Sequence, residues 1–157
     1  MNKEEIKNLI QELIEKTKVA VHAISITEDK PGNTWFQVEL SEPHFFVNRD
    51  GEGLLALNHV VKKIIEAKNS VTDPQTKPNI LIDVNGFQQK RIEGIKAIAH
   101  MMAERARYFK SNIEVDPMSS FERRIVHEFL SNETDLKTES AGFGPARRVV
   151  IKYIGEI

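Results

Sequence analysis

Apolar residues along this chain alternate between helical spacing and strand spacing, and the order of these segments limits the folds available to it. The expected elements of the first half are a helix at 3–17, strands at 19–27 and 34–40, a helix from 54 to 65 and a strand at 79–84. The turn signal Lys30-Pro31-Gly32-Asn33 joins the two strands into a hairpin. The first half therefore predicts an α-β-β-α-β module.

The second half follows a different order. Its expected elements are a long helix at 87–110, a strand at 112–115, a helix at 119–130 and strands at 136–140 and 147–154. This order, α-β-α-β-β, predicts a three-stranded sheet packed by two helices. Asn85-Gly86 ends the preceding strand, so we expect an α+β protein with domains at 1–85 and 86–157 and no flexible linker.

Composition excludes several classes of function. The 157 residues include no cysteine, which rules out disulfides, cysteine-based zinc sites and thiol nucleophiles. The net charge of −1 means that any anion-binding surface has to be local. No apolar run reaches membrane-spanning or signal-peptide length, so we expect a cytoplasmic protein without membrane insertion. Four histidines lack the spacing of metal ligands, and we expect neither a metal nor a cofactor. These four are His22, His44, His59 and His100.

Ser119–Phe129, with the sequence SSFERRIVHEF, predicts an amphipathic helix with one basic side. Ser119 followed by Glu122 is a capping box, which marks a helix start. At about 100° per residue, the side expected to be buried carries Phe121, Ile125, Val126, Phe129 and Leu130. The opposite side, expected to face solvent, carries Arg123, Arg124 and His127.

Guanidinium and imidazole groups placed together offer several donors to a phosphate oxygen. Arg147 and Arg148 begin the last strand directly after the Gly/Pro turn at 141–145, and this turn should bring them near Arg123 and His127. The expected site is a surface where these four basic side chains converge. Two simpler interpretations remain open, which are a solvated helix face with an ordinary ion pair and strand ends that tolerate arginine.

These residues together resemble a known family. Arg123-x-x-x-His127, the segment 138–142 (TESAG) and the segment 145–151 (PARRVVI) resemble the single-stranded nucleic-acid-binding domain named for its R-x-x-x-H motif. With Asp116-Pro117-Met118 before them, they are similar to the bacterial Jag (SpoIIIJ-associated) proteins, in which a KH domain precedes this module. Segments 47–57 (VNRDGEGLLAL) and 80–89 (ILIDVNGFQQ) resemble the KH loop and the interdomain junction.

Two features depart from the Jag pattern. Jag proteins often carry a further N-terminal domain and linker, which have no counterpart in these 157 residues. The KH loop is normally Gly-x-x-Gly, whereas this chain reads Asn48-Arg49-Asp50-Gly51. Asn tolerates left-handed geometry but adds bulk, and Asp50 and Glu52 bring negative charge to a phosphate-binding position. The loop is therefore either a weakened binding site or a purely structural part of the KH fold.

The resemblance implies a non-catalytic protein that binds single-stranded RNA or DNA and regulates RNA metabolism linked to cell growth and division. It implies phosphate contacts from Arg123 and His127, extended by Arg147, Arg124 and Arg148, and a second contact at Asn48–Gly51. Other RNA-binding or cell-division proteins are implied as partners. An adaptor that uses the same folds as a scaffold is the alternative, and a nuclease using His127 ranks last because no carboxylate cluster accompanies it.

Two further sets of residues have simpler interpretations. Asp83 ends an apolar strand without a visible catalytic partner, so a turn or cap role is expected. Trp35 and Phe36 would stack on bases only if they were exposed, and one of them should be core in an alternating strand.

Overall fold

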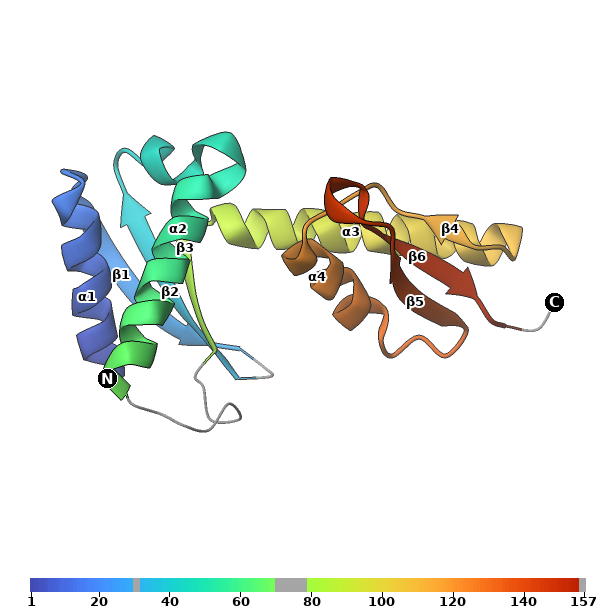
Figure 1. The fold of residues 1–157 in the computed structure, drawn as a ribbon, viewed down its shortest axis with the longest axis horizontal. Coiled ribbons are helices and arrows are strands. Elements are labelled where there is room, and N and C mark those ends of the chain that lie inside the picture. Colours follow the sequence, from blue (N-terminus) through green and yellow to red (C-terminus); the bar gives the residue numbers. More distant parts are fainter. Residues whose placement is uncertain (30–31, 70–78, 156–157) are drawn as a thin grey trace. The chain divides into compact units, whose positions relative to one another are not determined.

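The computed structural model describes residues 1–29, 32–69 and 79–155, which form two compact units, Met1–Gln89 and Lys90–Ile157. Each unit combines helices with one three-stranded sheet, and the predicted α+β class is confirmed (Figure 1). Lys30 and Pro31 of the predicted turn lie outside the described residues, as do residues 70–78 between the expected helix and the strand at 79–84.

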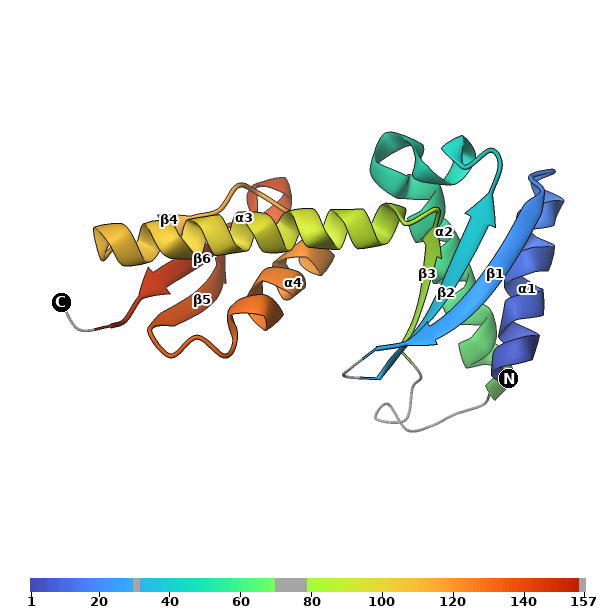
Figure 2. The same cartoon turned by 180° about the vertical axis from the view of Figure 1, so that it is seen from behind.

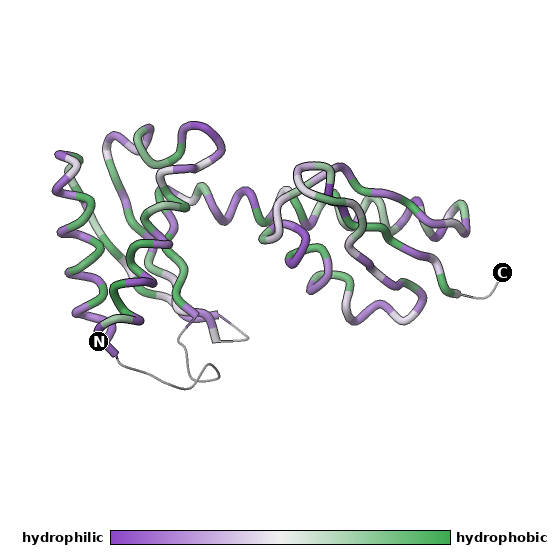
Figure 3. The backbone as a smooth tube through the Cα atoms, viewed as in Figure 1, coloured by the Kyte–Doolittle hydropathy of each residue, from purple (hydrophilic) through white to green (hydrophobic). Residues whose placement is uncertain are grey.

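The first unit is a sheet covered on one face by two helices. Its elements are α1 (Lys3–Lys16), β1 (Val21–Glu28), β2 (Asn33–Leu40), α2 (His44–Asn69) and β3 (Asn79–Val84). The strand order is β1-β2-β3, with β1 antiparallel and β3 parallel to the central β2. Apolar residues recur on one side of α1 (Figure 3), and the core joins Ile10 and Ile14 to Phe36, Val61 and Val84.

α2 consists of two helical pieces. Its backbone leaves helical geometry from Asn48 to Gly51, at the position where the sequence predicted a loop. The preceding turn, His44–Val47, is helical, and no helix was predicted there. Gly53 allows the two pieces to approach closely, because a Cβ there would lie 2.6 Å from the carbonyl oxygen of Phe45.

The second unit packs two helices on one face of its sheet (Figure 2). Its elements are α3 (Phe87–Phe109), β4 (Ile113–Glu114), α4 (Ser120–Leu130), β5 (Leu136–Ala141), the short 3₁₀ helix η2 (Gly144–Ala146) and β6 (Arg148–Tyr153). The antiparallel strand order is β4-β6-β5. Three small residues, Ala99, Ala103 and Ala106, bring α3 against the buried Val149 and Ile151 of β6.

The start of α3 is anchored to the first unit. The carboxylate of Asp83 accepts hydrogen bonds from the backbone N–H groups of Gln88, at 2.7 Å, and Gln89, at 3.2 Å. Asp83 is only 1% exposed, and these bonds satisfy its buried charge. The predicted cap role of Asp83 is confirmed. The residues of α3 before Lys90 therefore belong to the first unit.

Candidate nucleic-acid interface

The capping box predicted for α4 is present. Ser119 Oγ accepts from the N–H of Glu122 at 3.3 Å, and Glu122 Oε2 accepts from the N–H of Ser119 at 2.8 Å. The helix therefore starts at Ser120 with Ile125 and Val126 buried against the sheet. Phe129, predicted to be buried with them, is 39% exposed, so the apolar side is narrower than expected.

Glu122 also ties α4 to α3. Its Oε1 accepts from Arg91 Nε at 3.1 Å and from Arg91 Nη2 at 2.8 Å. Burial acts to raise the pKa of Glu122, but the hydrogen bonds from Ser119 and Arg91 outweigh it and hold that pKa below its usual value. Glu122 is thus held ionised between two partners, and this pair fixes the helix that carries the basic residues.

His127 does not lie free on a solvated face, which corrects the sequence-based placement. Nδ1 lies 2.7 Å from Thr138 Oγ1, and Nε2 lies 3.0 Å from Ser140 Oγ, both on β5. Burial of the ring and, to a lesser degree, the charge of Arg123 lower the pKa of His127. A neutral imidazole accepts at one nitrogen and donates at the other, so the two hydroxyls hold the ring without a positive charge.

Arg123 folds back over the start of its own helix and is half-buried. Its Nη1 donates to the carbonyl oxygen of Met118 at 2.8 Å, and its Nη2 donates weakly to Ser120 Oγ at 3.5 Å. Its Nε is buried without a hydrogen-bond partner among the described residues. The guanidinium group therefore keeps unused donor capacity in this position, and an outward rotation would lose only one strong hydrogen bond.

Arg147 lies close to Arg123 through Met118. The N–H of Met118 donates to the carbonyl oxygen of Arg147 at 3.1 Å, while the Met118 carbonyl accepts from Arg123. The side chain of Arg147 is exposed. Arg124 is exposed on α4 and forms no ion pair with Glu128 in the described part of the chain.

Arg148 does not join the other basic residues, which corrects the predicted convergence of four. Val149 and Ile151 of β6 face the helices, so the neighbouring Arg148 points to the opposite face of the sheet. There Arg148 Nη1 lies 3.4 Å from Glu114 Oε2 of β4. The basic surface of this unit, which we call the α4 surface, consists of Arg123, Arg124, His127 and Arg147.

The predicted loop Asn48–Gly51 has an unusual backbone. Asn48 is extended, with φ −66° and ψ 159°, so the left-handed geometry expected there is absent. It lies instead at Arg49 (φ 53°), Asp50 (φ 56°) and Gly51 (φ 80°). A Cβ at Gly51 would lie 2.6 Å from the ring of Phe87, so glycine is required. Left-handed geometry at two non-glycine residues costs about 1–2 kcal/mol each.

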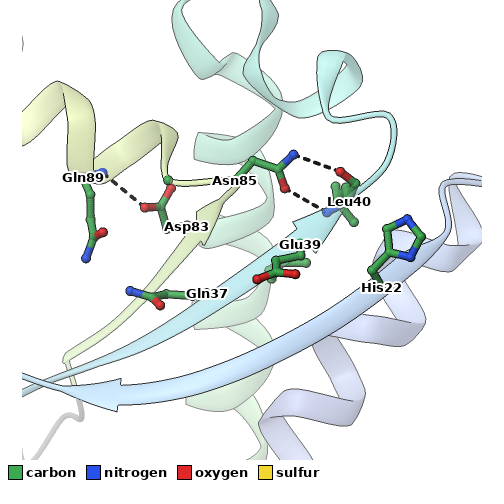
Figure 4. A pocket seen from close by; sticks show the side chains of 9 residues that line it. His22, Gln37, Glu39, Leu40, Asp83, Asn85 and Gln89 are labelled. Carbon is green, nitrogen blue, oxygen red and sulfur yellow. Dashed lines mark hydrogen bonds between the residues drawn. The ribbon is translucent and has the colours of Figure 1, made fainter.

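A polar hollow on the first unit was not predicted from the sequence (Figure 4). It is lined by His22, Gln37, Val38, Glu39, Leu40, Asp83, Asn85, Gly86 and Gln89. Asn85 exchanges two hydrogen bonds with the backbone of Leu40, at 2.8 and 2.9 Å, and Asp83 caps α3. These groups therefore have structural partners, and no His, Cys, Asp or Glu cluster suited to a metal occurs among the residues described.

The aromatic residues considered for base stacking are buried, and a different aromatic residue is exposed. Trp35 is 7% exposed and Phe36 is fully buried, so neither is available for stacking on a base. Phe143 was not among the predicted site residues, and it is 91% exposed in the turn between β5 and β6. Its flanking glycines and the following proline, Gly142-Phe143-Gly144-Pro145, were the available signal for an exposed turn position.

Comparisons with known proteins match the second unit to a domain family and a longer part of the chain to several bacterial proteins. Residues 93–153 match the family model of the R-x-x-x-H ("R three H") domain. The chain is 26% identical to RNA-binding protein KhpB of Clostridium symbiosum, over 67% of this chain and 45% of that protein. It is 33% identical to the Bacillus subtilis protein of the same name, over 51% of this chain and 39% of that protein.

A third relative, RNA-binding protein KhpB of Streptococcus pneumoniae serotype 2, is 29% identical over 73% of this chain and 34% of that protein. The chain thus spans less than half the length of these curated relatives. In the described part of the chain, no helix is both long and apolar enough to cross a membrane.

Proposed function

We propose that this chain binds single-stranded RNA or DNA in the cytoplasm without catalysis. Residues 93–153 match the R-x-x-x-H domain, and the chain is related to the bacterial KhpB proteins of the Jag family, as the resemblance of its motifs predicted. The observation that carries this proposal is the arrangement of Arg123 beside His127. The imidazole is held by Thr138 and Ser140, and Arg123 lies at the N-terminal end of α4 with a donor that is unpaired among the described residues.

Phosphate binding at the α4 surface follows from its donors. Arg123 rotates outward and exchanges its bond to Met118 for a charge-assisted bond to a phosphate oxygen. Arg124 and Arg147 are exposed and add positive charge to this surface. His127 contributes by holding α4 against β5, because both of its ring nitrogens are paired with Thr138 and Ser140 and its lowered pKa keeps the ring uncharged at neutral pH. Phosphate contacts carry no base information, so sequence preference at these residues is modest.

We also propose that the first unit is a KH-like domain that makes a weaker contact. The α-β-β-α-β order and the break in α2 at Asn48–Gly51 support this assignment. Strained backbone at Arg49 and Asp50 is typical of a functional turn. The loop offers one cation, Arg49, beside Asp50 and Glu52, and its contribution to phosphate binding is correspondingly small.

The alternative function, a protein-interaction adaptor, is favoured by one observation. Ile98, Met101 and Tyr108 recur along α3 and are 42%, 51% and 82% exposed. Cell-division or other RNA-binding proteins are the partners that the family resemblance implies, and a role in RNA metabolism linked to growth belongs to the same proposal. An adaptor binds its partner through apolar surface, so raising the salt concentration leaves its binding unchanged.

The test compares two charge reversals in the same unit. Arg123→Glu changes the proposed site, whereas Arg105→Glu changes an exposed arginine of α3 that has no ion pair among the described residues. We expect Arg123→Glu to weaken binding of a fluorescent 12-nucleotide RNA by about fivefold or more and Arg105→Glu to leave it within about twofold. Equal losses in both variants, or no binding by the parent protein at low salt, contradict the proposal.

A further inference from the structure

Phe143 is the most exposed of the large hydrophobic side chains in the described part of the chain. Phe45 packs edge-on against Phe46, and Tyr108 packs edge-on against Phe109, with ring centroids 5.1 and 5.0 Å apart. Phe143 makes no ring contact within the described residues, and it is 91% exposed. A side chain this exposed adds almost nothing to the stability of the fold.

The turn that carries Phe143 is nonetheless closely defined. Gly142 has φ +90°, and a Cβ at this position would lie 3.1 Å from the carbonyl oxygen of Ala146. The Phe143 carbonyl accepts from the N–H of Ala146 at 3.3 Å, and the Gly144 carbonyl accepts from the N–H of Arg147 at 3.1 Å. Pro145 further restricts the backbone in the first turn of η2. The exposed ring is therefore presented on a restrained turn.

This turn adjoins the α4 surface. It follows Ser140, which holds the His127 ring, and it ends at Arg147, whose carbonyl oxygen is bonded to Met118. Met118 in turn accepts the hydrogen bond of Arg123. The Phe143 turn, the His127 imidazole and the Arg123 guanidinium group are thus connected through Ser140, Arg147 and Met118.

We propose that Phe143 stacks on a nucleobase of the strand whose phosphates bind at the α4 surface, so that this site recognises single-stranded nucleic acid by base as well as by backbone. The proposal rests on the function proposed above. Every base presents a flat face, and aromatic stacking of this kind tolerates different sequences but requires unpaired bases. A duplex keeps its bases stacked on one another, and Phe143 therefore adds preference for single strands.

The test separates the base from the backbone. The full chain and its Phe143→Ala variant are titrated with a 12-nucleotide oligoadenylate and with an abasic ribose-phosphate oligomer of equal length. We expect Phe143→Ala to weaken oligoadenylate binding by about 5- to 100-fold and to change abasic-oligomer binding by less than about twofold. Phe143→Trp should retain binding, and its added indole should be quenched by oligoadenylate relative to the parent protein.

The outcomes distinguish this inference from the function on which it rests. If Phe143→Ala binds oligoadenylate as tightly as the parent while Arg123→Glu does not, stacking is refuted and nucleic-acid binding stands. If Phe143→Ala loses both oligomers equally, Phe143 positions the turn and does not stack. If the parent binds neither oligomer but captures a protein through Phe143, both the inference and the proposed function fail.

Discussion

Nδ1 of His127 lies 2.7 Å from Oγ1 of Thr138 and thereby links the last turn of α4 to β5. A residue that the helical pattern assigned to the solvent side is consequently part of a helix–sheet contact. The same contact fixes the position of the imidazole ring. In this position the ring is partly buried and lies near the charge of Arg123, and both conditions lower the pKa of His127.

Thr138→Val is expected to destabilise the second unit. The substitution keeps the shape of the side chain but removes the hydroxyl bonded to His127, leaving a partly buried ring nitrogen unpaired. We expect a loss of about 1–2 kcal/mol in the free energy of unfolding, measured by urea denaturation. Thr134→Val changes an exposed threonine of the same unit that has no described hydrogen bond and should have little effect. Similar losses in the two variants would refute the role of the contact.

The stability of the protein should rise with pH around the titration of His127. Burial and then Arg123 lower the pKa of the folded ring from its ordinary 6.5, so the unfolded chain binds more protons in this window. The contribution to stability is complete above pH 6.5 and is lost as the pH falls through the lowered value of the folded state. Urea denaturation from about pH 5 to 8 measures it, and His127→Gln should show a smaller slope than the parent.

Arg147→Glu should weaken RNA binding more than Arg148→Glu. Arg147 borders the α4 surface, whereas Arg148 points to the opposite face of the sheet and pairs with Glu114. Reversing one exposed phosphate contact costs on the order of 1 kcal/mol, or about fivefold in affinity. Fluorescence anisotropy at one salt concentration measures both variants. A larger loss for Arg148→Glu would place the binding face on the other side of the sheet.

The salt dependence of binding provides a count of the cations involved. Three arginines, Arg123, Arg124 and Arg147, with a neutral His127, predict a slope of log K against log salt of about −2 on a single strand. Titrations at several salt concentrations near neutral pH determine this slope. A slope near zero would favour the adaptor function, and a slope well beyond about −3 would require Arg148 or the first unit to contribute.

Gly51→Ala and Gly94→Ala should change stability in opposite directions. A methyl group at Gly51 meets the Phe87 ring and occupies a residue with φ +80°, so we expect a loss of about 1–3 kcal/mol. Gly94 lies within α3 with no atom near its absent Cβ, and alanine there should stabilise the helix by about 0.5–1 kcal/mol. Thermal unfolding of both variants measures the difference.

The sequence alone determined most of the elements, their order and the family resemblance. Local signals were sufficient for this, because apolar spacing and the Ser119–Glu122 capping box depend on neighbours within a few residues. The α+β class, the short strand β4 and the helix that follows the loop at Asn48–Gly51 all followed from such patterns. The R-x-x-x-H resemblance likewise came from residues whose spacing along the chain is visible without a fold.

Only the tertiary structure decided which side chains meet. The pairing of β5 with β6 put Arg148 on the face away from α4, and the packing of α4 on β5 brought His127 between two hydroxyls. Helical periodicity marks which side of α4 is polar, but it does not reveal that a polar strand segment lies beside that side. The exposure of Phe143 likewise depends on the fold of a turn, because an aromatic residue in a sequence is equally compatible with a core and with a surface.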